Sequence, residues 1–413
     1  MGDETPCESR NYYKNRAISI DIFLKCDIIF VLIGVRKEKK MVIGCTKKLL
    51  DFLGVKPQKL TAETNPLFSW TANLIILNHR KTLVAVNDAT KCCFVLHGLT
   101  AKSISKLPEL MKDGIRAVLQ SEYIASDVID KYLTDCGENL TFTTTASRSD
   151  VASCNKACAR VERFVNLFES DSMFQEKYLP WINDDMIAKE DYSFIYEKLI
   201  TTLTERYGAP VQSAHVAELE VTLDLLTPCK RTLVVPSNLN FYQLHRILQD
   251  AFEWHDCHLH QFVLTRDKYE RPMKIIQPEF IKNEDWLALD ESLESTDSTT
   301  VTVREIFESQ KNLDYEYDFG DGWIHTIKLK RFIPNCTTPY PHCTEAIGDA
   351  PMEDSGGPYG FDEKMKILNN PDHPEHEWIS EWVRSAWWHP LDFDAINRRI
   401  RQEHRRCIPV QYD

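Results

Sequence analysis

The sequence predicts an α+β protein of two small mixed α/β domains, the second with a β-grasp-like sheet and helices packed against it. The chain has 413 residues, more than a single hydrophobic core usually covers. Apolar residues make up 43% and charged residues 27%, which is the composition of a globular protein. Patterns typical of strands and of helices alternate in two groups, before and after residue 210.

The first domain is expected at residues 41–167. A strand that begins at Met41 leads to Thr46, a residue type that favours a helix N-cap, and leucines at helical spacing follow until Gly54 ends the helix. The later elements are predicted as strands at 70–77, 82–87 and 93–96, helices at 103–120 and 124–133, a strand at 140–145 and a helix at 149–167. Residues 168–212 are interpreted as a connecting segment.

Two interpretations are open for residues 1–40. Translation could start at Met41, because the preceding Arg-Lys-Glu-Lys-Lys run can be written in purine codons, as a ribosome-binding tract would be. Alternatively, the segment is an extension that packs onto the first domain. Its apolar stretch at 18–35 contains Asp21, Lys25 and Asp27, and charges at such positions disfavour a membrane-spanning helix.

The second domain is expected at residues 213–413. Two strands at 216–225 and 231–235 precede a helix in which Phe241, Leu244, Leu248 and Phe252 recur at helical spacing. The remaining elements are predicted as a strand at 260–265, a charged excursion at 284–297, a helix at 303–309, strands at 313–318 and 323–331, and helices at 361–368, 376–384 and 393–404.

The charge balance limits the partners that we expect. With 62 acidic and 49 basic residues the net charge is −13, which disfavours broad adhesion to DNA or anionic membranes. The 13 scattered cysteines fit reduced thiols in a cytoplasmic protein, and we expect no membrane association. The cluster of Arg398, Arg399, Arg401, Arg405 and Arg406 is a candidate nucleic-acid contact, or else complements the end of a closing helix.

A candidate metal site lies in the second domain. His258 and His260 would share one face of a strand, because side chains alternate along a strand. Asp318 and Asp321 flank a glycine turn close to His325, so nitrogen and oxygen ligands for zinc, manganese or iron would come together. The alternative is that the aspartates cap their own turn and the histidines are ordinary hydrogen-bonded residues. No cofactor is certain, and a divalent metal is the candidate.

Other residues extend this candidate site. Glu353 and Asp354 precede a Gly-Gly-Pro loop and are the candidate catalytic carboxylates. Arg231, Trp254 and Trp323 are the candidate binding residues, although core packing is the alternative for both tryptophans. The chain lacks G-x-S-x-G, a phosphate loop, a dinucleotide fingerprint and a C-x-x-C pair, so the common motifs of hydrolases, NTPases, dehydrogenases and zinc ribbons are absent.

Four strings in this half of the chain occur together in one known family. They are Trp254 with His258-Leu259-His260-Gln261-Phe262, the run YEYDFGDGWIH at 315–325, PMEDSGGPYG at 351–360 and NPDHPEH at 370–376. Over about residues 213–400 the chain therefore resembles the plasmid pRi ORF-three-like family, also known as transposon passenger TnpR-type proteins. The resemblance implies an α+β fold and a link to plasmid or mobile genes of prokaryotes, without an assigned reaction.

Two further points follow from resemblance. Where Ala350 stands, many relatives carry a cysteine that could pair with the equivalent of Cys343, so a two-cysteine metal site is not expected here. Residues 41–165 resemble a second, uncharacterised bacterial domain through strings that include Asn65-Pro66-Leu67 and Ser147-Arg148-Ser149.

The sequence thus leaves two functions in competition. The first is a ligand-binding, partner-binding or regulatory module associated with plasmid or mobile-element genes, with a protein or small ligand as partner. The alternative is a metal-dependent hydrolase of phosphodiesters or nucleic acids, with the histidines and Asp318 or Asp321 as ligands and Glu353 or Asp354 as general base.

Overall fold

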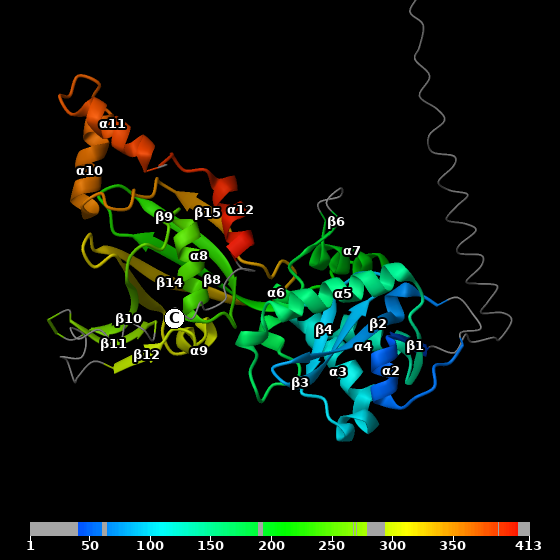
Figure 1. The fold of residues 1–413 in the computed structure, drawn as a ribbon. Helices are drawn as coiled ribbons and strands as arrows, with labels where there is room; N and C mark the ends of the chain where they lie inside the picture. Colours follow the sequence, from blue (N-terminus) through cyan, green and yellow to red (C-terminus); the bar gives the residue numbers. More distant parts are fainter. Residues whose placement is uncertain are drawn as a thin grey trace, which may run out of the picture.

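The fold is known from a computed structural model, which describes residues 40–59, 64–188, 193–266, 268–269, 271–278, 294–386 and 388–403. These residues form two units, each with its own hydrophobic core (Figure 1). The predicted α+β class in two mixed units is confirmed. The hypotheses on the N-terminal extension concern residues outside the described ranges, apart from Lys40. Within those ranges, no helix combines the length and the apolar character needed to cross a membrane.

The first unit is built on a five-stranded sheet in the order β4-β3-β2-β1-β5. Its strands are β1 (Lys40–Cys45), β2 (Ser69–Leu77), β3 (Arg80–Asn87), β4 (Cys93–His97) and β5 (Asn139–Thr144). β1 pairs in parallel with β2 and β5, and β2, β3 and β4 pair antiparallel. β2 and β3 form a hairpin that closes at Asn78 and His79, which both have positive φ, as a two-residue turn between twisted strands requires.

The helices of the first unit begin and end largely where local signals place them. They are α2 (Lys47–Leu53), α3 (Leu107–Ser121), α4 (Ser126–Cys136) and α5 (Arg148–Glu162), with short 3-10 turns at Pro66–Phe68 and Ala101–Lys106. The Ser147 hydroxyl accepts a hydrogen bond from the Asp150 amide and caps α5. Gly114 lets α3 pack closely on the sheet, because a Cβ there would lie 2.3 Å from the Phe94 ring.

The predicted connecting segment is packed into the first unit. It follows a 3-10 turn at Val165–Leu167 and contains a 3-10 turn at Glu176–Tyr178, α6 (Leu179–Ile182), β6 (Met186–Ala188), β7 (Ser193–Phe194) and α7 (Ile195–Tyr207). Leu179, Leu199 and Leu203 are buried in the first core. The Asn183 amide also hydrogen-bonds the backbone of Cys93 on β4, at 2.7 and 2.9 Å. The interpretation as a connection missed this packing, because the individual elements are short.

The second unit is built on an eight-stranded sheet in the order β12-β11-β10-β13-β14-β8-β9-β15. Its strands are β8 (Ala214–Leu223), β9 (Cys229–Pro236), β10 (His260–Arg266), β11 (Pro272–Gln277), β12 (Glu294–Asp297), β13 (Asn312–Tyr317), β14 (Trp323–Cys336) and β15 (His342–Ile347). All neighbours pair antiparallel except β11 and β12. β15 and β12 are the two edge strands and were not predicted, β12 falling at the end of the expected charged excursion.

The described part of the second unit contains α8 (Phe241–Ala251), α9 (Val303–Phe307), α10 (Gly357–Leu368), α11 (His376–Ser385) and α12 (Phe393–Glu403). α8 begins with a reciprocal capping box, in which the side chains of Asn240 and Gln243 each accept a hydrogen bond from the other's amide. Its buried residues Leu244 and Leu248 enter the second core. α12 contacts both α8 and β15, so the last helix closes against the edge of the sheet (Figure 1).

One buried cation joins three parts of the second unit. Arg231 on β9 has no exposed surface. Its Nε donates to Ala251 O at the end of α8 (2.9 Å), and its Nη1 donates to Ile347 O and Gly348 O at the end of β15 (both 3.0 Å). The guanidinium carbon also lies 5.2 Å from the centre of the Phe252 ring. Arg231 therefore fixes the end of α8 relative to the end of β15.

We expect Arg231→Met to lower the free energy of unfolding by about 2–4 kcal/mol, because buried carbonyl oxygens would lose their donors. Urea unfolding of the full chain measures the change. The control is Arg331→Met on the exposed part of β14, where the arginine pairs with Glu218 at the surface and removal should change stability by less than about 0.5 kcal/mol. Equal effects of the two substitutions would contradict the role of Arg231.

Candidate functional site

One pocket of about 240 Å³ lies in the second unit. It is lined by the loop after α8 (residues 252–259), by the loop after β15 (348–356), and by Ala386, Trp388, His389 and Arg399. The turn that joins β13 to β14 (318–322) lies beside the loop after β15, and none of its residues lines the pocket. The Trp254 indole N–H donates to Pro351 O at 2.8 Å, and the Gly356 amide donates to Asp321 Oδ2 at 2.9 Å. These hydrogen bonds tie the loop after β15 to the loop after α8 and to the turn between β13 and β14, so residues far apart in sequence form one surface.

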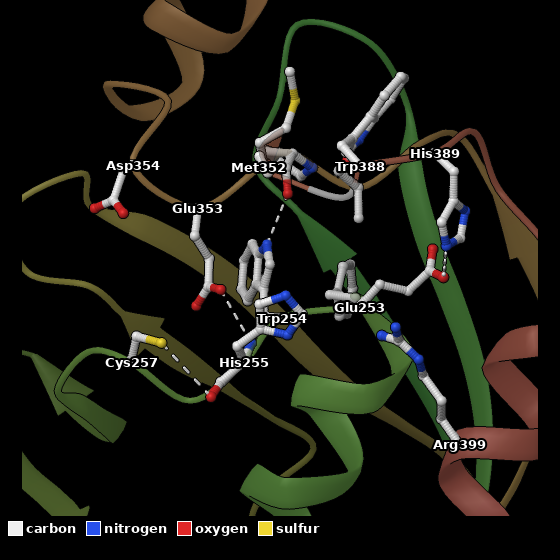
Figure 2. A pocket seen from close by; sticks show the side chains of 14 residues that line it. Glu253, Trp254, His255, Cys257, Met352, Glu353, Asp354, Trp388, His389 and Arg399 are labelled. Atoms are coloured by element: carbon white, nitrogen blue, oxygen red, sulfur yellow. Dashed lines mark hydrogen bonds and ion pairs between the residues drawn. The ribbon is translucent and has the colours of Figure 1, made fainter. Parts of the chain in front are cut away.

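The pocket has an apolar wall and charged groups at two ends. Apolar surface comes from Phe252, Trp254, Ala350, Pro351, Met352, Ala386 and Trp388. Figure 2 shows Glu353, Asp354 and Cys257 on one side of Trp254, and Glu253, His389 and Arg399 on the other. The Glu253 carboxylate lies 3.2 Å from His389 Nε2. Burial raises the pKa of Glu253, and the charges of His389 and Arg399 act against that increase.

The turn between β13 and β14 is shaped by Asp318. This residue has φ of +54°, which aspartate tolerates better than most residues, and its Oδ1 accepts hydrogen bonds from the amides of Gly320 (3.0 Å) and Asp321 (3.3 Å). Asp318 therefore caps its own turn, as the alternative to metal binding predicts. The Asp321 carboxylate instead binds the Gly356 amide of the neighbouring loop.

Gly357 allows the loop after β15 to approach this turn. Its φ is +71°, and a Cβ at this position would lie 2.5 Å from the Asp321 carbonyl oxygen. Asp354, three residues earlier, has φ of +59°. The close approach places the Asp354 carboxylate next to the turn.

The structure brings together only part of the predicted metal-ligand set. His258 Nε2 lies 3.6 Å from Asp318 Oδ2 and 3.3 Å from Asp354 Oδ1. Asp354 was predicted as a catalytic carboxylate and lies here with the candidate ligands. His258 itself precedes β10, which begins at His260, so the expectation that these two histidines share one strand face is wrong.

His260 belongs to a different cluster, which sequence reasoning missed. Its ring stacks on that of His245, with centroids 3.4 Å apart and planes 6° apart. His245 bonds the Tyr315 hydroxyl and Asp256, each at 2.8 Å. Burial lowers the pKa of both imidazoles, that of His260 most strongly. A histidine within the apolar face of the predicted helix 241–252 was the signal that could have indicated His245.

His325 lies in the core beneath the site. Its neighbours at two-residue spacing on β14, Trp323 and Ile327, are also buried, so strand alternation points all three inward. The ring makes edge contacts with Phe252 (4.5 Å) and Trp254 (5.2 Å), and Nδ1 bonds Tyr315 O at 3.3 Å. Burial lowers its pKa to about 3. His325 therefore lies outside the cluster that contains His258 and Asp318, although the sequence predicted that all three would bind the same metal.

The remaining predicted residues have distinct surroundings. Glu353 accepts hydrogen bonds from the Tyr317 hydroxyl and the His255 amide, one on each carboxylate oxygen. Trp254 lines the pocket, whereas Arg231 and Trp323 are fully buried and do not line it.

The C-terminal arginines of the predicted cluster have different surroundings. Arg398 pairs with Asp392 at 3.7 Å and Arg399 lines the pocket. Arg401 lies exposed on α12, and Arg405 and Arg406 lie outside the described ranges. A nucleic-acid contact through this cluster stays a prediction.

Comparison with known proteins identifies the family of this unit. Residues 215–397 match the plasmid pRiA4b ORF-3-like protein family. The uncharacterized protein y4hQ of Sinorhizobium fredii is 34% identical over 192 residues, which cover 46% of this chain and 89% of that protein. The chain therefore belongs to the plasmid pRiA4b ORF-3-like family through its second unit, and the resemblance predicted from the four strings is confirmed.

Two further comparisons gave matches. Residues 42–196 match a domain of unknown function, DUF6933, in agreement with the predicted second resemblance. A crystal structure of a protein of unknown function from Methanosarcina mazei Go1 is 27% identical, with a TM-score of 0.36, and the match covers 44% of this chain and 96% of that one.

The buried histidines predict acid sensitivity. Unfolded histidine titrates near pH 6.5, whereas His325 in the folded chain titrates near 3, so between these values the unfolded state binds the extra proton. The free energy of unfolding should fall as pH drops below about 6.5, by up to about 1.4 kcal/mol per pH unit for each such histidine. Urea unfolding from pH 7 to 4 should show a shallower slope for His325→Phe than for wild type. His255→Gln at the surface is the control, and parallel curves for wild type and His325→Phe would refute the assignment.

The turn predicts a difference between two substitutions of Asp318. Asp318→Ala should destabilise the chain by about 1–2 kcal/mol, because alanine at positive φ is strained and cannot accept the two amide hydrogen bonds. Asp318→Asn retains an acceptor oxygen and should stay within about 0.5 kcal/mol of wild type. Unfolding in urea without added metal provides the measurement. Similar losses for both variants would show that the charge, and not the cap, matters there.

Proposed function

We propose that the second unit is a ligand-binding module that takes a small organic molecule into the pocket beside Trp254. The observation that carries the proposal is the 240 Å³ pocket itself. The loops after α8 and β15, the residues after α11 and Arg399 of α12 build it from apolar side chains and a few convergent charged groups. This combination is typical of ligand sites, whose volumes run from about 300 to 1,000 Å³. The pocket lies just below that range, so a ligand of one or two rings fits the proposal best.

The charges of the pocket indicate which ligand would bind. Arg399 can pair with an anionic group at one end, beside Glu253 and His389. Glu353 and Asp354 at the other end favour a cationic group or a hydrogen-bond donor. Met352 and Trp254 offer an apolar surface between the ends (Figure 2). A ring compound that carries an anionic group, with or without an amine, satisfies these features.

The alternative function is a metal-dependent hydrolase. The cluster of His258, Asp318 and Asp354 favours it, because Asp354 also lines the pocket. Its weak point is the general base. Both oxygens of Glu353 already accept hydrogen bonds, and Asp354 faces His258. Because the contacts that the two predicted bases, Glu353 and Asp354, already make compete with taking a proton from water, we favour binding over hydrolysis.

The biological setting is part of the proposal. The name of the matched family supports an association with plasmid-borne genes, and a regulatory module that senses a small molecule would suit that setting.

Indole probes with different charges test the pocket. We expect indole-3-acetate and tryptophan to bind the full chain saturably, and Arg399→Gln to weaken both at least about tenfold, because a charge-assisted hydrogen bond contributes about 1.5–3 kcal/mol. Tryptamine, which lacks a carboxylate, should be affected less. Isothermal titration gives the dissociation constants.

Arg398→Gln is the matched control, since Arg398 is the preceding residue on α12 but does not line the pocket. The proposal fails if none of the three probes binds saturably. It also fails if Arg398→Gln and Arg399→Gln weaken the carboxylate probes equally.

A further inference from the structure

We propose that His258, Asp318 and Asp354 bind one divalent cation, with zinc as the first candidate, at the edge of the pocket. One nitrogen and two carboxylate oxygens from these residues all lie within 4.8 Å of one another. A shared cation would need only small side-chain movements to bring such atoms to about 2.0–2.2 Å from its centre. This site shares only Asp354 with the pocket proposed above for an organic ligand, so variants of the other residues test the two proposals separately.

The ligand atoms of two residues are oriented by neighbouring groups. Asp318 Oδ1 accepts the two amide hydrogen bonds of its turn, and this leaves Oδ2 facing His258. The His258 ring makes an edge contact with Tyr317, at 5.7 Å and 76°, and the Tyr317 hydroxyl binds Glu353. Such outer contacts fix ligand orientation in metal sites.

The His258 nitrogen supplies a second observation. Nε2 is buried as an atom but makes no hydrogen bond with acceptable geometry in the described part of the chain. It points between two carboxylates, at 3.3 and 3.6 Å, which is too far for an optimal hydrogen bond to either. A cation between the three groups would satisfy this nitrogen and separate the two carboxylates.

The charge and the exposure of the cluster also fit a cation. Two carboxylates and a neutral imidazole balance a charge of +2. The Asp354 side chain is 75% exposed, so a cation can enter from solvent. Three protein ligands leave one position of a tetrahedral zinc ion free for water or for a group of a ligand in the pocket.

The second His–Asp cluster, formed by His245, Asp256 and His260, fits a cation less well. Both nitrogens of His245 already have hydrogen-bond partners, and Asp256 Oδ2 binds the guanidinium of Arg246 at 2.7 Å. A cation there would displace a bond and meet the charge of Arg246. We therefore assign the cation to the cluster at His258.

Titration of the metal-free full chain with Zn²⁺ and with Co²⁺ tests the assignment. The expected result is one equivalent per chain, with visible Co²⁺ absorption from a site of nitrogen and oxygen ligands. His258→Gln, Asp318→Asn and Asp354→Asn should each weaken binding at least tenfold. Asp354→Asn changes an exposed side chain, so at least one variant should keep its fold, which unfolding in urea without metal verifies.

Two controls separate the clusters. His255→Gln removes an exposed imidazole from the same loop, and Asp256→Asn changes the second cluster; both should retain wild-type metal affinity. The proposal is overturned if wild type binds neither ion stoichiometrically, or if the three ligand variants bind as tightly as wild type. Loss of binding in Asp256→Asn alone would place the cation in the second cluster and also overturn it. Binding of the indole probes in Arg399→Gln reports on the pocket separately.

Discussion

The positions of two loops that line the pocket depend on the buried side chain of Arg231. An arginine keeps its charge in the core, so its N–H groups must find acceptors there. Its Nε and Nη1 find them at Ala251 O, the last residue of α8, and at Ile347 O and Gly348 O at the end of β15, which are the points where two loops that line the pocket begin. A single side chain thus sets the separation of the Trp254 loop from the Met352 loop.

A layer of aromatic and imidazole rings supports the site from below. Trp254 stacks on Tyr317 at 4.9 Å and 19°, and His325 contacts Trp254 at its edge. The polar ends of these rings are hydrogen-bonded outward: the Trp254 indole to Pro351 O, and the Tyr317 hydroxyl to Glu353. The apolar core and the polar surface are therefore one connected structure, and buried rings determine where the surface carboxylates lie.

The proposed cation and the proposed organic ligand would occupy adjacent positions. Asp354 belongs to the cluster at His258 and also lines the pocket, so a bound cation would neutralise the acidic end of the pocket. A ligand with a second anionic group could then bind there, whereas without the cation an amine is favoured. The choice between an anionic and a cationic ligand group would in this way depend on whether the cation is bound, although the pocket is lined by the same side chains with and without it.

Local patterns in the sequence determined the elements that have strong periodicity or clear caps. Helix α8 follows from its apolar spacing and the Asn240 cap, and the turn at Asp318 follows from its glycines. The two edge strands and the packing of α6 and α7 in the first core required the tertiary structure, because partners distant in sequence stabilise them. The surroundings of the three predicted histidines also depend on the tertiary structure. His258 lies in the cluster with Asp318 and Asp354, His260 stacks on His245, and His325 lies in the core. Side-chain neighbours depend on which strands pair and where loops end, and local periodicity does not contain that information.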